Sequence, residues 1–484
     1  MENKLFFDVE DKPKFGQMLI FALQQLLAIL AATIAVPTII GLPTQIPAAI
    51  LGAGVGTLVY QLFTKRKSPV FLGSSFALLG SLGVAVAYGY CGIILGSIVA
   101  GLVYVVIAAV IKLVGTGWVN KLMPPVIIGP TVALIGLSLA GAAMGDMVKA
   151  NGTILTQTLA DGSVVSLFGN YNLVGLLCGL IAFGTIVICS TQKRFTMPRL
   201  IPFIIGIAAG YAVAAIFTAI GNAANIDYLR IVNFQPIVDN FVNADGTFKG
   251  ITAFVDYPRF ALLEGINEIA TGNVKLDAGS AVEVVVAFLP VALVVFAEHI
   301  ADHKNLGSII GRDLITEPGL ARTLLGDGVG SIMGTIFGVC PNTTYGESVG
   351  CVAITRNASV VTITTTAIMC IVLSFIRPVM VLLQTIPSCV MGGVCLTLYG
   401  FIAVSGLKMF KHLDLNDNKN LFVVASILIS GIGGLTIQIP YAFAENGAVA
   451  ATIQITSIAT ALIIGIITNA VLTKLEKSKL GQEK

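Results

Sequence analysis

The chain has 484 residues, of which 56% are hydrophobic and 11% are charged, and its formal net charge is +3. Soluble domains carry roughly 25% charged residues, so this composition excludes a soluble globular protein. The small net charge gives no sign of a nucleic-acid partner, and membrane lipid is the expected surrounding of so apolar a chain.

Long apolar runs follow one another along the sequence. A membrane-spanning helix needs about 20 predominantly apolar residues. Fourteen runs approach that length, and the third and tenth are interrupted by polar residues and glycine. They lie at about 16–40, 46–63, 69–88, 91–114, 121–144, 172–190, 200–220, 281–301, 324–340, 342–360, 361–376, 379–404, 420–437 and 453–473. The sequence therefore predicts an all-α polytopic membrane protein with fourteen membrane-spanning segments.

An even number of segments places both termini on one side of the membrane. Lysine and arginine gather in the loops of that side, for example at 65–67, and they are sparse in the loops of the other side. Positive charge favours the cytoplasmic side, so we expect a cell-membrane protein with both termini in the cytoplasm. The outer loops at 145–171 and 221–280 carry no catalytic motif. We expect both to be structural covers, the first of them a hairpin.

The stretch 341–350 places polar groups inside an apolar run. Tyr345, Gly346 and Glu347 follow one another there. Ionisable groups at membrane depth are costly and usually face a cavity or a pathway, and non-helical backbone persists there only where it lines protein or water. The stretch 74–77 of the third segment has the same order of two hydroxyl residues, an aromatic residue and a small residue as 343–346. Interrupted segments at matching places in two halves point to a transporter site, and an odd number of segments per half would invert the second half.

The eighth segment ends in a cluster of ionisable residues. Glu298 and Asp302 are four residues apart and share a helix face. A carboxyl group in a low-dielectric cavity can stay protonated near neutral pH, which is the minimum requirement for proton coupling. The alternative interpretation is a cytoplasmic helix end with solvated charges.

His299 and His303 are also four residues apart, beside Asp302. This arrangement imitates a zinc-binding helix, but the general-base glutamate that follows the first histidine in metalloproteases is replaced by Ile300. No third ligand is evident, so we expect no metal site, and a membrane enzyme is the weaker alternative to a transporter.

Two aromatic residues and two acids suit one class of ligand. Phe76 and Tyr345 offer rings for stacking, and Glu298 and Glu347 accept from N–H groups. Backbone amides near Gly346 would donate to carbonyl oxygens, as helix N-termini do. The set predicts a flat, neutral heterocycle with several N–H donors and carbonyl groups.

The residues at 347–356 resemble the signature of the nucleobase–ascorbate transporter family, in which an acid or glutamine precedes asparagine, any residue, glycine, four residues and threonine. Residues 341–347 resemble the version found in bacterial uracil permeases, and 71–77 and the Gln24–Gln25 pair also fit. The resemblance implies two inverted repeats of seven segments, with short β-strands in segments 3 and 10. It further implies a core domain at 16–114 and 281–376 and a gate domain at 121–220 and 379–473.

The resemblance also assigns roles to residues. Glu298 and Glu347 would hold the polar edge of a nucleobase, Phe76 and Tyr345 would give rings, and backbone near Gly346 would donate. Proton coupling would fall to Glu298 and Asp302, with the proton as coupling ion and no other cofactor. Residues that would support the site are Ser75, Asn342, Thr344, Ser348 and Gln24. Relatives in the family are dimers, so a homodimer is expected.

Two departures from the family pattern bear on the site, the first on its local hydrogen-bond support and the second on the substrate. Ser348 stands where the family usually has asparagine. Asp302 stands where uracil permeases resemble one another in having histidine, and purine-transporting relatives more often carry aspartate there. Glu347 favours uracil instead, because it should touch the ring directly. We expect a proton-coupled uracil symporter. The alternatives are xanthine or another purine as substrate, sodium as coupling ion, and a passive exchanger on the same fold.

Overall fold

The computed structural model describes residues 5–149, 156–158, 164–166, 171–192, 194, 198–199, 201–243, 245–274, 276–443 and 449–482. Nine helices in this part of the chain are long and apolar enough to span a membrane. The protein is therefore a multi-pass membrane protein. Shorter helices and interrupted segments lie between the nine, at several of the places where the sequence predicts further spans.

One group of helices packs mainly within itself. Helix α13 contacts α2 and α4, α15 contacts α1 and α2, and α12 contacts α4. Small residues allow this close packing: a Cβ atom at Gly52 of α2 would overlap the Gly334 carbonyl of α13. The members of the group are α1 (Phe15–Ile39), α2 (Ile46–Phe63), α4 (Gly89–Val114), α12 (Ala278–Ile310), α13 (Leu320–Phe337) and α15 (Val360–Ser374).

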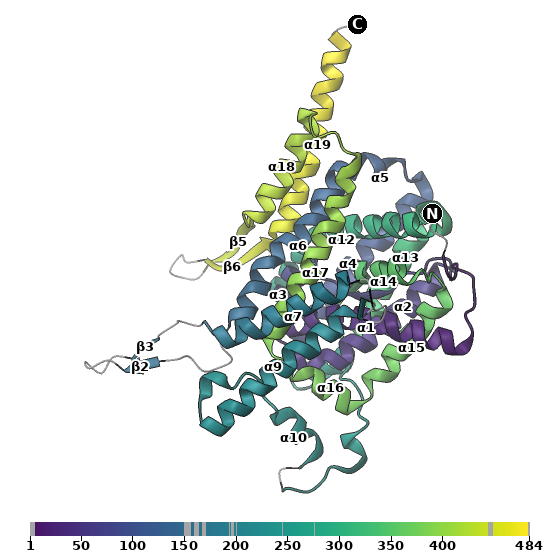
Figure 1. Ribbon diagram of the computed structural model, residues 1–484. Coiled ribbons are helices and arrows are strands. Elements are labelled where there is room, and N and C mark those ends of the chain that lie inside the picture. Colours follow the sequence, from purple (N-terminus) through teal and green to yellow (C-terminus); the bar gives the residue numbers. More distant parts are fainter. Residues whose placement is uncertain are drawn as a thin grey trace.

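A second group of helices also packs mainly within itself. Helix α17 contacts α6 and α7, α7 contacts α9, and α18 contacts α6 and α19. Figure 1 shows α18 and α19 side by side, with the C-terminus at the far end of α19. The members are α6 (Pro125–Val148), α7 (Leu173–Thr191), α9 (Pro202–Ala224), α17 (Ser388–Lys408), α18 (Asn418–Ile432) and α19 (Ser457–Gln482).

Two interrupted segments meet in the first group of helices. Strand β1 (Leu72–Ser74) precedes α3 (Leu79–Val86), and β4 (Asn342–Thr344) precedes α14 (Gly346–Thr355). The strands pair antiparallel, with Gly73 opposite Thr343. Hydrogen bonds from Ser75 N to Pro341 O and from Tyr345 N to Phe71 O extend the pairing. Backbone groups at membrane depth need partners, and each broken segment supplies them to the other. The strands lie in segments 3 and 10, where the family resemblance places them.

Three boundaries differ from those that hydropathy predicts. The run 379–404 is two helices, α16 (Arg377–Gln384) and α17, which begins after Pro387. The run 420–437 ends as a helix at Ile432 and continues into a hairpin of β5 (Ile437–Phe443) and β6 (Val449–Ile455). Helix α12 continues to Ile310, well past 301, so the acidic cluster lies within the helix and not at its end.

The loops contain short elements. The loop at 145–171 holds the two-stranded pair β2 (Thr156–Thr158) and β3 (Val164–Ser166), as predicted, although residues 150–155 and 159–163 lie outside the described part. The loop at 221–280 contains α10 (Gln235–Phe241), η3 (Gly250–Ala253) and α11 (Ala261–Ala270). Helix α5 (Gly117–Leu122) precedes α6.

The N-terminal segment 5–11, here called the N-terminal strap, lies against the chain that follows α14. Phe6 N donates to Arg356 O at 2.7 Å, and Ala358 N donates to Phe7 O at 2.9 Å. Val9 is buried, and Arg312 beyond the end of α12 forms an ion pair with Asp8 at 2.8 Å. The strap therefore ties the end of α12 to the end of α14.

Candidate functional site

Helix α12 carries four ionisable residues into the interior. Glu298 and Asp302 are 8% and 5% exposed, and His299 and His303 are fully buried. A solvated helix end, the alternative interpretation of this cluster, is therefore wrong. Asp302 accepts a hydrogen bond from Thr344 of β4, and Glu298 lies one helical turn earlier on the same face of α12.

Strand β4 is held from two sides by acidic residues. Thr344 donates from Oγ1 to Asp302 Oδ2 of α12 at 2.7 Å. The neighbouring Thr343 directs its hydroxyl to Asp327 Oδ2 of α13 at 3.5 Å. Successive residues of a strand point to opposite faces, so one three-residue strand is fastened to two different helices. This arrangement fixes the position of α14, which begins directly after the strand.

The side chains of the two histidines reach different neighbouring helices. His299 Nδ1 lies 2.7 Å from Asp327 Oδ2, and His299 Nε2 lies 3.0 Å from Thr323 Oγ1. His303 Nε2 lies 2.8 Å from the Tyr60 hydroxyl, and His303 Nδ1 lies 2.8 Å from the His299 carbonyl. Among the described residues, no group of three His, Cys, Asp or Glu side chains is placed to hold a metal ion. Both histidines therefore link α12 to neighbouring helices.

Helix α14 begins beside the acids. Its first residue, Gly346, is exposed although the preceding residues 341–345 are buried. A Cβ atom at Gly346 would meet only Asp302 Oδ1, at 3.8 Å. The first amides of a helix have no partner within the helix, and the N-terminus favours electronegative atoms. The amides of α14 can therefore donate to a carbonyl oxygen placed in the space before Gly346.

Two carboxyl groups of this region each have an oxygen without a partner. Glu298 Oε2 and Glu347 Oε1 are buried and accept no hydrogen bond from the residues that the structure describes. Buried polar atoms are normally satisfied, so these oxygens are the places where a ligand with N–H donors would gain most.

Side chains of neighbouring elements hold the stretch from β4 into α14 in place. Gln25 of α1 donates from Nε2 to the Ser348 hydroxyl of α14. Asn342 Nδ2 donates to Gly52 O of α2 at 2.8 Å. The ring of Tyr345 lies over Gly73, and its hydroxyl lies 3.4 Å from Thr33 Oγ1.

Phe76 forms a contact between the two groups of helices. Its ring meets that of Tyr399 of α17 edge to face, with ring centroids 5.3 Å apart. Because α17 belongs to the second group, this pair lies at the boundary between the groups. The arrangement brings one predicted ring of the site next to the second group of helices.

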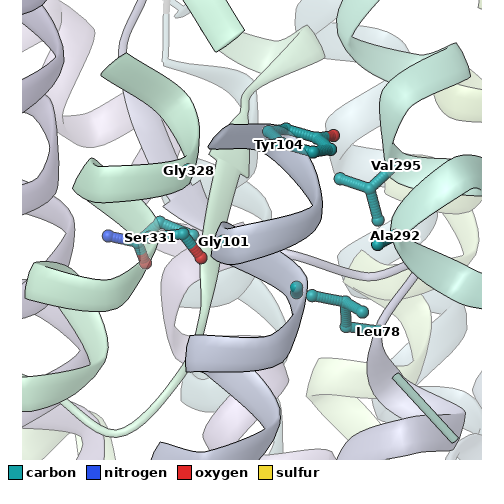
Figure 2. A pocket seen from close by; sticks show the side chains of 9 residues that line it. Leu78, Gly101, Tyr104, Ala292, Val295, Gly328 and Ser331 are labelled. Atoms are coloured by element: carbon teal, nitrogen blue, oxygen red, sulfur yellow. The ribbon is translucent and has the colours of Figure 1, made fainter. Parts of the chain in front are cut away.

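A small cavity lies between α4, α12 and α13, next to Asn342 of β4. It measures ≈ 10 Å³ and is lined by Leu78, Tyr104, Ala292, Val295 and Asn342, among others. Figure 2 shows the Tyr104 ring and the side chains of Val295, Ala292 and Leu78 arranged around it. This volume suffices for about one water molecule, so the cavity is too small for an organic ligand. Neither Glu298 nor Glu347 lines it.

The structure brings most of the predicted site residues together around β1, β4 and α12. Ser75 supports the site through its backbone, while Gln25, not the predicted Gln24, donates to Ser348. Gln24 is buried in α1. Sequence reasoning missed Asp327 and Tyr399. Asp327 could have been recognised as a candidate, because it is an acid inside an apolar run. Nothing in the sequence distinguishes Tyr399 from a core aromatic residue.

Comparison with known proteins identifies the family. The Permease family model (Xan_ur_permease) matches residues 16–439. The chain belongs to this family. A uracil permease of Bacillus caldolyticus is 35% identical over 475 residues, which cover 97% of this chain and 95% of that protein. The uracil permease of Bacillus subtilis is 34% identical over 99% of this chain and 98% of that protein, and that of Escherichia coli K12 is 32% identical over 92% of each. The permease is thus a transporter and not an enzyme.

Solved structures support the fold of this permease. The transmembrane domain of the cyanobacterial bicarbonate transporter BicA superposes with a TM-score of 0.55, covering 96% of this chain and 100% of that one at 14% identity. The murine solute carrier 26 member A9 anion transporter gives 0.57, covering 96% of this chain and 69% of that one at 12% identity. At these identities the likeness concerns the fold alone.

Proposed function

We propose that this permease imports uracil together with a proton across the cell membrane. The observation that carries the proposal is the pair of unpartnered carboxylate oxygens, Glu298 Oε2 and Glu347 Oε1, beside the start of α14. Uracil presents N–H donors and carbonyl acceptors on one flat ring. Its N–H groups would donate to the two glutamates, and a carbonyl oxygen would accept from the amides near Gly346. The names of the relatives support uracil as the base.

The proton is assigned to Glu298. An ionised carboxylate that is buried with an unpaired oxygen is costly, so the protonated form would suit the loaded site. Neutral uracil carries no charge, and a co-transported proton would add the voltage term of about 2.3 kcal/mol per charge per 100 mV. Release to the cytoplasm would accompany loss of the proton from Glu298. Asp302, one turn further along α12, is the second candidate for proton coupling.

Movement of the first group of helices against the second would alternate access to the site. We assign the first group to a core domain and the second to a gate domain, each composed of seven segments in inverted repeats, fourteen in all. The separate packing of the two groups and the Phe76–Tyr399 contact at their boundary support this assignment. Both termini would lie in the cytoplasm. A homodimer is proposed on the family resemblance alone.

Uptake into proteoliposomes tests the coupling. With an inward proton gradient, we expect labelled uracil to accumulate, and we expect a protonophore to abolish accumulation while a sodium gradient has no effect. Glu298→Gln should bind uracil without accumulating it. Glu317→Gln is the control, because Glu317 is exposed and its ion pair is with the exposed Lys67. Accumulation by Glu298→Gln would move the coupling role elsewhere, and uptake that resists the protonophore would indicate exchange.

Thermal stabilisation tests the substrate. A ligand that binds only the folded state raises the apparent stability by mass action. Uracil, xanthine, guanine, hypoxanthine and uric acid are compared across pH 5 to 8, a range of roughly three units around the pH where a buried carboxyl can titrate. We expect a shift with uracil, larger at the acidic end. A shift with xanthine instead would mean that Asp302 was the better guide to the substrate than Glu347.

A further inference from the structure

Helix α11 of the loop at 221–280 lies on the first turn of α4. Ala261 and Gly265 of α11 are buried. A Cβ atom at Gly265 would lie 3.5 Å from Cys91 Sγ and 3.6 Å from Ile94 Cδ1. This close packing fixes α11 to a helix that is long and apolar enough to span the membrane.

A carboxylate of α11 caps α4. Glu268 accepts hydrogen bonds from Tyr90 N at 3.0 Å and from Cys91 N at 3.3 Å. A negative charge at a helix N-terminus satisfies orphan amides and interacts favourably with the helix dipole. Because α4 is long and apolar enough to span the membrane, we expect its first turn, and α11 packed on that turn, to lie near one membrane surface.

The free face of α11 is apolar. Leu262, Ile266 and Ile269 recur at helical spacing, Leu263 lies beside them, and all four are between 42% and 63% exposed. Glu264 and Glu268 lie on the other side of the helix, because residues three or four apart share a face, and Asn267, four residues after Leu263, lies at the edge of the apolar face. Contiguous exposed apolar patches on a protein mark interaction surfaces.

We propose that this face of α11 inserts into the lipid leaflet on the side of the membrane opposite the N-terminus. The insertion would hold the first group of helices, to which α4 belongs, at a fixed depth. The occupant follows from continuity, since α4 itself exposes Leu102, Val106 and Val110 along its length, where lipid is the expected neighbour. Residues 261–270 contain no lysine or arginine. Binding therefore rests on apolar area and not on attraction to anionic headgroups.

Tryptophan fluorescence tests the insertion, because the chain contains a single tryptophan, Trp118 of α5. In a Trp118→Phe background, Ile266→Trp places a probe on the apolar face, and Glu264→Trp places a matched probe on the opposite, polar face two residues away. The full-length variants are reconstituted in phosphatidylcholine vesicles whose acyl chains carry bromine near the glycerol end. If Trp118→Phe does not fold, the same probes are read in the wild-type background after subtraction of the Trp118 emission.

We expect bromolipid to quench the probe at position 266 at least several-fold more strongly than the probe at 264, and aqueous iodide to do the reverse. Adding phosphatidylglycerol should leave both unchanged. Equal quenching of both probes by iodide would place the face in water and overturn the proposal. A probe at 266 that resists both quenchers would overturn it in favour of a second copy of the chain covering the face.

Discussion

Thr344 of β4 donates a hydrogen bond to Asp302 of α12, one turn from the proposed proton-binding residue Glu298. Both partners are buried. Thr344→Val keeps the shape of the side chain and removes the donor, which leaves a buried carboxylate oxygen without its partner. This loss costs about 1–3 kcal/mol. We expect uracil uptake at low substrate concentration to fall by about tenfold or more, a factor set by that energy. Thr344→Ser, which retains the hydroxyl, should recover most of the uptake; equal loss in both variants would contradict the role of this hydrogen bond.

Gly73 of β1 has no room for a side chain. A Cβ atom there would overlap the ring of Tyr345, which begins the turn into α14. We expect Gly73→Ala to displace Tyr345, to lower the Tm of the purified protein and to abolish uracil-dependent stabilisation. Gly83→Ala in α3 is the matched control, because nothing lies within 4 Å of a Cβ atom there. Normal uracil binding by Gly73→Ala would show that the strand and the ring move apart without cost.

Gln25 and Ser348 connect α1 to α14 by one hydrogen bond, so their effects should not add. Gln25→Ala and Ser348→Ala are each expected to weaken uracil binding, and the double variant should be no weaker than the worse single variant. A double-mutant cycle measured by thermal stabilisation gives the coupling, which for contacting residues is about 0.5–3 kcal/mol. Additive losses would mean that the two residues act separately. Ser348→Asn introduces the residue usual in the family, and its uracil binding shows whether an amide can replace the Ser348 hydroxyl as the partner of Gln25.

The N-terminal strap should make stability depend on pH at the acidic end. Partial burial of Asp8 opposes ionisation, but the hydrogen bond from Val9 N and the Arg312 guanidinium outweigh it and lower the pKa of this carboxyl. A group with a depressed pKa stabilises the fold above its unfolded pKa of about 3.9 and loses that contribution as the pH falls through the folded pKa. Asp8→Asn should therefore cause a small fall in Tm at neutral pH and none at strongly acidic pH. Glu10→Gln, which removes the longer 3.5 Å contact to Arg312, should change Tm less.

Much of the architecture can be read from hydropathy, because a long apolar run in lipid has few alternatives to a helix. The interruption at 341–347 likewise indicated a polar site. The strands β1 and β4 were expected only through the family resemblance, since three residues are too few for an alternating pattern to be recognised. Pro387 was a usable signal for the break between α16 and α17, because the residue before a proline disfavours helix.

Other parts of the site depend on contacts between distant segments. Asp327 is visible in the sequence as an isolated acid, but its pairing with His299 is set by how α13 packs on α12. Tyr399 looks like any core aromatic residue until α17 brings it against Phe76. The ends of α12 were misjudged because the polar cluster from Glu298 to His303 resembles a helix terminus, whereas burial against neighbouring helices allows the helix to continue to Ile310.

The pairing of β1 with β4 also constrains how the protein is made. Leu72 finds its partner Thr344 only after more than half of the chain has been synthesised. Until then the peptide groups around Gly73 have no strand to bond with, and leaving such groups bare in hydrocarbon costs several kcal/mol each. The unpaired backbone groups of β1 must therefore stay near water or beside the insertion machinery until β4 has been synthesised and inserted. Assembly of the binding site is consequently a late step of biogenesis, completed only when both halves are in the membrane.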